Sequence, residues 1–234
     1  MIFLSPSKLF GYVNIFLKII SKIILPLLVI SLISALLLSP QDYIQGNSVR
    51  IMYIHVPSAW ISLACFAVIS LLSILNFLFK IKNTFLIYKS LAPIGLLFSV
   101  ITIVTGSIWG KPTWGTWWVW DARLTSVVVL TLFYAAFILS YKFISNEEKS
   151  IKVCTSISIL GLINLFIIKY SVDWWATLHQ PASIKFNGET SIHGSMLVPL
   201  FLMLFTFLLY CGLIFLMKYK TEIIRIKKKG LKRL

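Results

Sequence analysis

Acidic residues are scarce in this chain, which has only seven Asp and Glu residues among 234 positions. Charged residues of both signs make up 12% of the sequence, whereas a soluble domain carries about 25%. Apolar residues fill 59% of the positions and occur in long runs. This composition excludes an ordinary soluble domain and is typical of a protein embedded in a lipid bilayer.

Cysteine is also rare, and the three cysteines, Cys65, Cys154 and Cys211, each lie inside an apolar stretch. They form no CxxC pair and no CxxCH motif, which excludes a dithiol redox site and a thioether-bound haem. The sequence also lacks a glycine-rich nucleotide-binding pattern, a Ser-His-Asp arrangement and paired carboxylates. We therefore expect that the chain is not an enzyme and that any ATP-driven step needs another subunit.

Positive charge is abundant, with 22 Lys and Arg residues and a net charge of +15. Such a charge can indicate nucleic-acid binding, but eight of the basic residues lie in the last 17 positions, directly after an apolar run. They are Lys218, Lys220, Arg225, Lys227, Lys228, Lys229, Lys232 and Arg233. A basic tail in this place is typical of a topology signal that contacts anionic lipid headgroups, so we expect a bilayer and no nucleic acid as partner.

Six apolar stretches approach the length of about 20 residues that a membrane-spanning helix needs. They comprise residues 19–38, 59–79, 91–108, 124–143, 153–168 and 196–217. The first exceeds the apolar part of a usual signal peptide and has no small-residue cleavage site after it, so we interpret it as a retained span. The sequence thus predicts an all-α, polytopic bundle of six transmembrane helices, forming one domain over residues 1–234.

The basic residues also predict the orientation of this bundle. With the N-terminus inside, 17 of the 22 Lys and Arg residues fall on the inner side and five on the outer side. Because positive residues favour the inner side of a membrane, we expect both termini to face the cytoplasm or the mitochondrial matrix.

All eight tryptophans and all three histidines then lie in or beside the three outer loops. An ordinary aromatic belt would decorate both membrane interfaces, so this one-sided distribution indicates a functional outer face. Five of the tryptophans occur within the twelve residues 109–120. A helix after Pro112 would place Trp114, Trp117, Trp118 and Asp121 on one face, because they are spaced i, i+3, i+4 and i+7.

We therefore predict a Trp-rich interfacial helix in the second outer loop. Its indole rings, Trp120 included, would form a platform for a large planar apolar ligand, and each indole would keep an N–H group for a polar edge of that ligand. The alternative is an interfacial anchor helix that binds no ligand.

Two histidines flank this loop in the neighbouring outer connections. His55 lies two residues before Pro57, which can begin the helix of the second span, and the residue directly before this proline favours extended backbone. We expect this arrangement to hold His55 at the membrane surface. His179 follows the fifth span. Two neutral imidazoles on either side of an aromatic platform can supply both axial ligands of a haem iron. The third histidine, His193, needs no role beyond that of an interfacial or capping residue.

Three outer basic residues, Arg50, Lys111 and Arg123, are candidates for contact with the two porphyrin propionates. Asp121 would repel propionates while it is ionised. We expect its carboxylate instead to pair with Arg123 or to accept indole N–H bonds, which would fix the geometry of the loop.

The segment from Trp114 to Thr125, WGTWWVWDARLT, resembles the tryptophan-rich signature of the haem-handling proteins of cytochrome c biogenesis. The sequences HVPSAW at 55–60, IWGKP at 108–112 and LHQP at 178–181 are similar to one branch, the haem exporter protein C family. The resemblance runs from about Tyr53 to Met203 and includes the six-span layout.

This resemblance implies that His55 and His179 are the axial ligands of a transiently bound, non-covalent haem b. It also implies that the segment from Trp114 to Asp121 receives the porphyrin. The implied location is the bacterial or mitochondrial inner membrane, with the haem site on the periplasmic or intermembrane-space side. The implied partners are an ATP-binding-cassette transporter, a small single-span membrane protein and a membrane-anchored haem chaperone.

Three other functions compete with haem delivery. The first is a haem lyase that attaches haem to apocytochrome c, although larger relatives with more spans and more histidine pairs perform that reaction. The second is a respiratory cytochrome b subunit, in which the haem-ligating histidines lie deep in the spans. The third is a solute channel, but no predicted span has the polar stripe that a pore requires.

Overall fold

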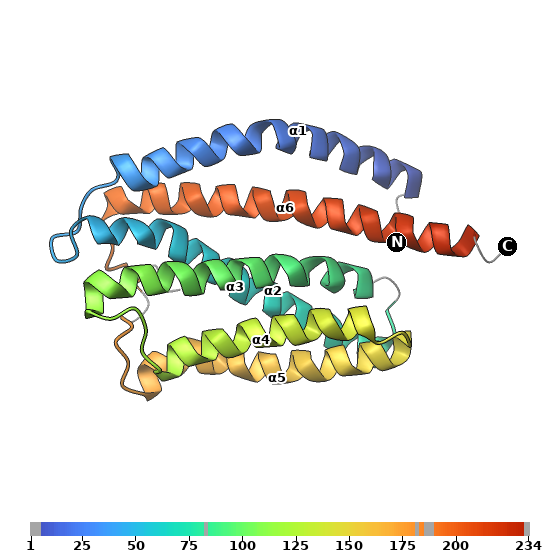
Figure 1. Ribbon diagram of the computed structural model, residues 1–234. Helices are drawn as coiled ribbons and strands as arrows, with labels where there is room; N and C mark the ends of the chain where they lie inside the picture. The colour runs from blue at the N-terminus through green and yellow to red at the C-terminus, as the bar shows by residue number, and fades with distance from the viewer. Residues whose placement is uncertain (1–5, 82–83, 181–182, 185–189, 232–234) are drawn as a thin grey trace.

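The computed structural model describes residues 6–81, 84–180, 183–184 and 190–231. Six long helices account for most of this part of the chain (Figure 1). They are α1 (Pro6–Ile33), α2 (Met52–Phe79), α3 (Thr84–Trp114), α4 (Ala122–Phe143), α5 (Glu147–Trp174) and α6 (Gly194–Leu231). A π-helical turn, η1 (Ser34–Leu38), ends α1, and a 3₁₀ helix, η2 (Asn47–Ile51), leads into α2.

Six helical segments of the described chain are long and apolar enough to cross a membrane, and each contains one of the six predicted spans. The all-α six-span prediction is therefore confirmed. The helices extend beyond the predicted stretches because the prediction counted only apolar runs, whereas the helix ends also contain polar and charged residues. Lys89 is one of these residues: it lies in α3 and pairs with Glu222 of α6 at 3.0 Å. Such side chains can reach polar surroundings while the backbone stays helical.

Helices α2, α3, α4 and α5 form a four-helix bundle, in which each helix packs against two of the others. Helices α1 and α6 pack against each other, and α6 also contacts α2 and α3 from the side away from α4 and α5 (Figure 1). Both termini lie at one end of the molecule, here called the terminal end. The connections α1–α2, α3–α4 and α5–α6 lie at the opposite end, here called the loop end (Figure 1).

The core of the four-helix bundle is aromatic and closely packed. Phe66 and Tyr134 are fully buried and meet edge to face with ring centroids 4.9 Å apart. Two glycines make room for them: a Cβ atom on Gly95 would lie 2.1 Å from the Tyr134 hydroxyl, and one on Gly161 would lie 2.2 Å from Phe66. The Tyr134 hydroxyl donates to the Ser62 carbonyl at 2.6 Å, which satisfies a polar group that no water reaches in a membrane.

Two elements at the loop end differ from the sequence predictions. The predicted Trp-rich interfacial helix is wrong, because α3 continues through Pro112 to Trp114 and residues 115–121 are not helical. Gly115 has a positive φ of 78°, and its N–H bonds to the Lys111 carbonyl, so the helix ends there in a left-handed turn that favours glycine. Asp121 then starts the next helix, since its carboxylate accepts the Leu124 N–H at 2.8 Å.

The start of α2 is also earlier than predicted. This helix begins at Met52, five residues before Pro57, so both His55 and the residue directly before the proline are helical, and the predicted extended backbone before Pro57 is wrong. Met52 and Tyr53 are buried in a cluster with residues of α1 and α6. Burial of these side chains favours the helical turn and outweighs the steric preference of the residue before proline for extended backbone.

Candidate functional site

A cavity of about 600 Å³ opens in the four-helix bundle at the loop end. Its walls come from α2, α3, α4 and α5, and two of its lining residues, Leu130 and Ile168, also belong to the bundle core. The α5–α6 connection (residues 175–193) contributes Leu178, His179 and Gln180 to the lining. The volume lies in the range of about 300–1,000 Å³ that is usual for cofactor and small-molecule sites.

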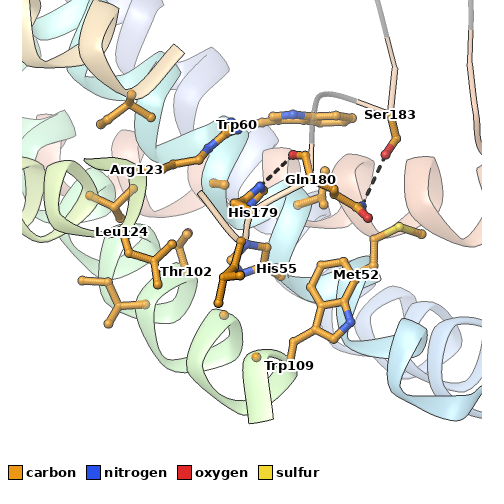
Figure 2. A pocket seen from close by; sticks show the side chains of 18 of the residues that line it. Met52, His55, Trp60, Thr102, Trp109, Arg123, Leu124, His179, Gln180 and Ser183 are labelled. Atoms are coloured by element: carbon orange, nitrogen blue, oxygen red, sulfur yellow. Dashed lines mark hydrogen bonds between the residues drawn. The ribbon is translucent and has the colours of Figure 1, made fainter. Parts of the chain in front are cut away.

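His55 and His179 both line this cavity, and Figure 2 shows both side chains within it. The imidazole of His55 projects from α2 toward α3. Its Nδ1 atom lies 3.1 Å from the Thr105 hydroxyl, and its ring meets the Trp109 indole edge to face at 5.7 Å. A Cβ atom on Gly106 would lie 2.8 Å from the His55 ring, so glycine at this position makes room for the imidazole.

The hydrogen bonds of Thr105 indicate which His55 nitrogen carries the proton. The Thr105 hydroxyl donates its proton to the Ile101 carbonyl at 2.6 Å, so its oxygen is left to accept a hydrogen bond from His55 Nδ1–H. The neutral ring then has its free lone pair on Nε2. A partner that fixes the tautomer in this way is typical of histidines that bind a metal through the other nitrogen.

In His179, too, a hydrogen bond at Nδ1 leaves Nε2 free, but here the partner is a backbone carbonyl in a loop. Its Nδ1 atom lies 2.9 Å from the carbonyl oxygen of Gln180, an acceptor, so Nδ1 carries the proton and Nε2 the lone pair (Figure 2). Its ring lies 6.4 Å from the Trp114 indole, centroid to centroid. Burial lowers the pKa of His179 below the usual histidine value, and the positive charge of Arg123 lowers it further. Both effects favour the neutral imidazole that binds metals.

Two imidazole nitrogens are too few ligands to hold a bare metal ion. Across residues 6–81, 84–180, 183–184 and 190–231, no group of three or more His, Cys, Asp or Glu side chains could hold a metal. Two nitrogen ligands suit a metal that arrives with its other ligands already in place, as the iron of a porphyrin does.

The tryptophans predicted to form a platform separate into two groups. Trp114 and Trp118 line the cavity, whereas the side chains of Trp117 and Trp120 are 55% and 77% exposed. The Nε1–H group of Trp118 is buried and has no hydrogen-bond partner. An unsatisfied donor beside a cavity is costly unless a ligand group accepts its hydrogen bond.

Asp121 is not a lining residue of this cavity. Besides the Leu124 N–H, its carboxylate accepts a hydrogen bond from the hydroxyl of Thr177, two residues before His179. The prediction that it pairs with Arg123 or accepts from an indole is wrong, since the ion pairs and hydrogen bonds of the described chain include neither contact.

Of the three predicted basic contacts, Arg123 lines the cavity. Arg50 lies elsewhere and donates to the carbonyls of Leu36 and Ser39, at 2.9 and 3.0 Å, so it caps the end of the first span. Lys111 donates to the Gly115 carbonyl at 3.0 Å and is exposed.

His193 lies outside the cavity lining, with its Nδ1 atom 2.7 Å from the Ser195 hydroxyl at the start of α6. This contact agrees with the minor role predicted for it.

The structure places in the cavity several residues that the sequence analysis did not assign as haem contacts. They include Thr102, Gly106 and Lys169, together with Trp60 and Trp109, which the sequence marked only as part of the outer tryptophan cluster. Most of them could have been found from the spacing of residues along one helix face. Once α2 includes His55, the lining residues Met52, His55, Val56, Ala59, Trp60 and Leu63 follow the i, i+3, i+4, i+7 spacing of one helix face. The same spacing relates Thr102, Gly106, Trp109 and Thr113 on α3.

The chain is similar in sequence to several known proteins. The chain is 41% identical over 194 residues to Heme exporter protein C of Bradyrhizobium diazoefficiens, an alignment that covers 83% of this chain and 74% of that protein. It is 40% identical over 191 residues to Heme exporter protein C of Escherichia coli strain K12, covering 82% and 77% of the two chains.

A plant mitochondrial protein is also similar. The chain is 46% identical over 186 residues to the putative cytochrome c biosynthesis ccmC-like mitochondrial protein of Marchantia polymorpha, which covers 80% of this chain and 78% of that protein. The family described as Heme exporter protein C matches residues 1–233. This chain therefore belongs to the haem exporter protein C family.

Proposed function

We propose that the cavity at the loop end binds haem, with His55 and His179 as the two axial ligands of its iron. The observation that carries this proposal is that both imidazoles line one cavity and that each has its Nδ1–H held by a hydrogen bond, which leaves Nε2 free for iron. The names of the relatives support haem as the cargo, because they describe haem export and cytochrome c biosynthesis.

Other lining groups fit the remaining parts of a porphyrin. Trp60, Trp109, Trp114 and Trp118 supply flat apolar surface, and the unpartnered Nε1–H of Trp118 can donate to a carboxylate. Arg123 is the predicted propionate contact that lies in the cavity, and its planar guanidinium suits a carboxylate. The protein residues thus hold haem by ligation, stacking and charge, without a covalent bond.

We further propose that the chain presents haem for cytochrome c maturation and does not retain it as a permanent group. Ligation by histidine is reversible, and one of the two ligands, His179, lies in the connection after α5 and not within a helix. The excess of basic residues toward the terminal end supports an orientation with both termini in the cytoplasm or matrix and the haem site outside. On this proposal, an ATP-binding-cassette transporter and a small single-span protein assemble with the chain, and a membrane-anchored haem chaperone receives the haem.

The ligand assignment is tested with the full-length protein in detergent, titrated with hemin and followed by visible absorption. Wild type should give a low-spin, six-coordinate spectrum, and His55→Ala and His179→Ala should each convert it to high spin or weaken binding. His193→Ala is the matched control and should behave as wild type. A wild type that binds no hemin, or binds it without either histidine, would overturn the proposal.

The delivery role is tested by mixing the haem complex with the purified chaperone and measuring which protein carries the haem. Loading of the chaperone supports delivery, whereas haem that stays on this chain in the presence of the chaperone contradicts it. Formation of thioether bonds on an added apocytochrome c, without any chaperone, would favour the alternative of a haem lyase.

A further inference from the structure

Thr177 connects the two loops that meet over the cavity. Its hydroxyl donates a hydrogen bond to Oδ2 of Asp121, in the α3–α4 loop. The Thr177 oxygen also accepts the backbone N–H of His179, at 3.1 Å. One hydroxyl therefore joins the last residue of the Trp-rich segment to the backbone of a proposed iron ligand.

The direction of this chain of hydrogen bonds is fixed by chemistry. An ionised carboxylate can only accept, so the Thr177 hydroxyl must give its proton to Asp121 and keep its lone pairs for the His179 N–H. The other carboxylate oxygen of Asp121 accepts the Leu124 N–H at 2.8 Å, and the Asp121 carbonyl accepts the Thr125 N–H at 3.0 Å. Asp121 is thereby fixed to the first turn of α4.

The two histidines differ in how their backbones are supported. His55 lies within α2, where the helical hydrogen bonds hold its backbone. His179 lies five residues after the end of α5, in the α5–α6 connection, and its Nδ1 atom bonds to the adjacent residue, Gln180. The contact through Thr177 connects the backbone of His179 to the residue that starts α4.

We propose that Asp121 is a positioning residue for His179 and acts through Thr177. Its carboxylate holds the His179 backbone at a fixed position relative to the first turn of α4. This turn also carries the lining residues Arg123 and Leu124. This inference rests on the proposed function, because it takes His179 as an axial ligand. It gives the carboxylate of the Trp-rich segment a role other than contact with the porphyrin.

The expected effect is a change in ligation and not simply a loss of the fold. Hydrogen bonds to charged groups are among the stronger ones in proteins, and loss of this one should shift the equilibrium between bound and dissociated His179 by roughly 10- to 100-fold. Haem should remain in the cavity through His55, with the second axial position open to an added ligand.

The experiment uses the full-length protein in detergent, loaded with hemin and separated from free hemin by size exclusion. Thr177→Val removes the hydroxyl at nearly constant shape, and Thr177→Ser restores it. Asp121→Asn keeps an oxygen for the Leu124 cap but loses the carboxylate. Thr221→Val is the control for the substitution itself, because the Thr221 hydroxyl bonds to the Met217 carbonyl within α6 and neither residue lines the cavity.

The readouts are the low-spin fraction of the haem that migrates with the protein and the imidazole concentration that restores low spin. Thr177→Val and Asp121→Asn should give high-spin haem that imidazole converts back, while Thr177→Ser and Thr221→Val should match wild type. A wild-type spectrum for Thr177→Val would overturn the inference. Should that variant fail to accumulate, a wild-type spectrum for Asp121→Asn would overturn it equally.

The failure of the inference is distinguishable from the failure of the proposed function. Wild type that binds no hemin, or binds it without His179, contradicts the haem site itself. Low-spin wild type together with low-spin Thr177→Val contradicts only the positioning role of Asp121.

Discussion

Substitution of Gly106 by alanine should weaken haem binding without removing any proposed ligand. The added Cβ atom would lie 2.8 Å from Cε1 and 3.3 Å from Nδ1 of His55, closer than van der Waals contact allows. The ring must then move, which stretches its 3.1 Å contact with Thr105 and shifts Nε2 in the cavity. Overpacking of this kind costs about 1–3 kcal/mol, which corresponds to roughly a 5- to 150-fold loss of affinity.

The assay is a hemin titration of the purified protein in detergent, together with thermal unfolding of the haem-free form. Gly212→Ala is the matched control, since it also lies inside a helix, α6, but a Cβ atom there would meet nothing within 4 Å. Alanine favours a helix over glycine by about 1 kcal/mol, so neither variant should unfold because of its backbone. Only Gly106→Ala should lose hemin affinity.

A double-mutant cycle separates the effect on His55 from other effects of the methyl group. In a His55→Ala background the methyl group has no ring to displace, so Gly106→Ala should cause little further loss of affinity. Wild-type affinity for Gly106→Ala would refute the reasoning. The reasoning would also be refuted if Gly106→Ala lowered hemin affinity just as much in the His55→Ala background, because the methyl group would then act on a residue other than His55.

Three further predictions follow from other parts of the site and the core. Because burial and Arg123 lower the pKa of His179, its ring stays neutral below the usual value near 6.5, so a pH titration should show low-spin haem persisting through that range and lost only at lower pH. Trp118→Phe, which deletes the buried unpartnered N–H, should reduce hemin affinity about fivefold, while Trp120→Phe should not change it in the same titration. Gly161→Ala, which forces a methyl group against a core ring, should destabilise the fold by about 1–3 kcal/mol in thermal unfolding without altering the haem spectrum.

The spans were predictable because their signal is composition averaged over about 20 residues, and a few charged side chains do not remove it. The helix ends were less predictable, since they depend on contacts between distant segments. Met52 and Tyr53 are helical because they are buried against α1 and α6, and no local pattern contains that information. The left-handed turn at Gly115 likewise ends α3 where helical spacing alone would have continued it.

The types of residue in the candidate site were predictable from the sequence, but their positions relative to one another were not. The histidines and tryptophans are unevenly distributed along the chain, and this can be seen without a structure. Their grouping depends on the path of the non-helical segment after α3: Trp114 and Trp118 line the cavity, whereas Trp117 and Trp120 do not. The partner of Asp121 was unpredictable for a different reason, since Thr177 lies 56 residues away and carries no sequence signal of its own.

Helix α5 ends at Trp174, and the described residues 175–180 that follow it carry His179 to the cavity lining. His55 lies on α2, and α2 and α5 pack directly against each other (Figure 1). The two imidazoles are therefore carried by neighbouring spans. A displacement of α2 relative to α5 would change the separation of the two nitrogen donors, so the packing of this helix pair sets the span that a ligand between them must fill.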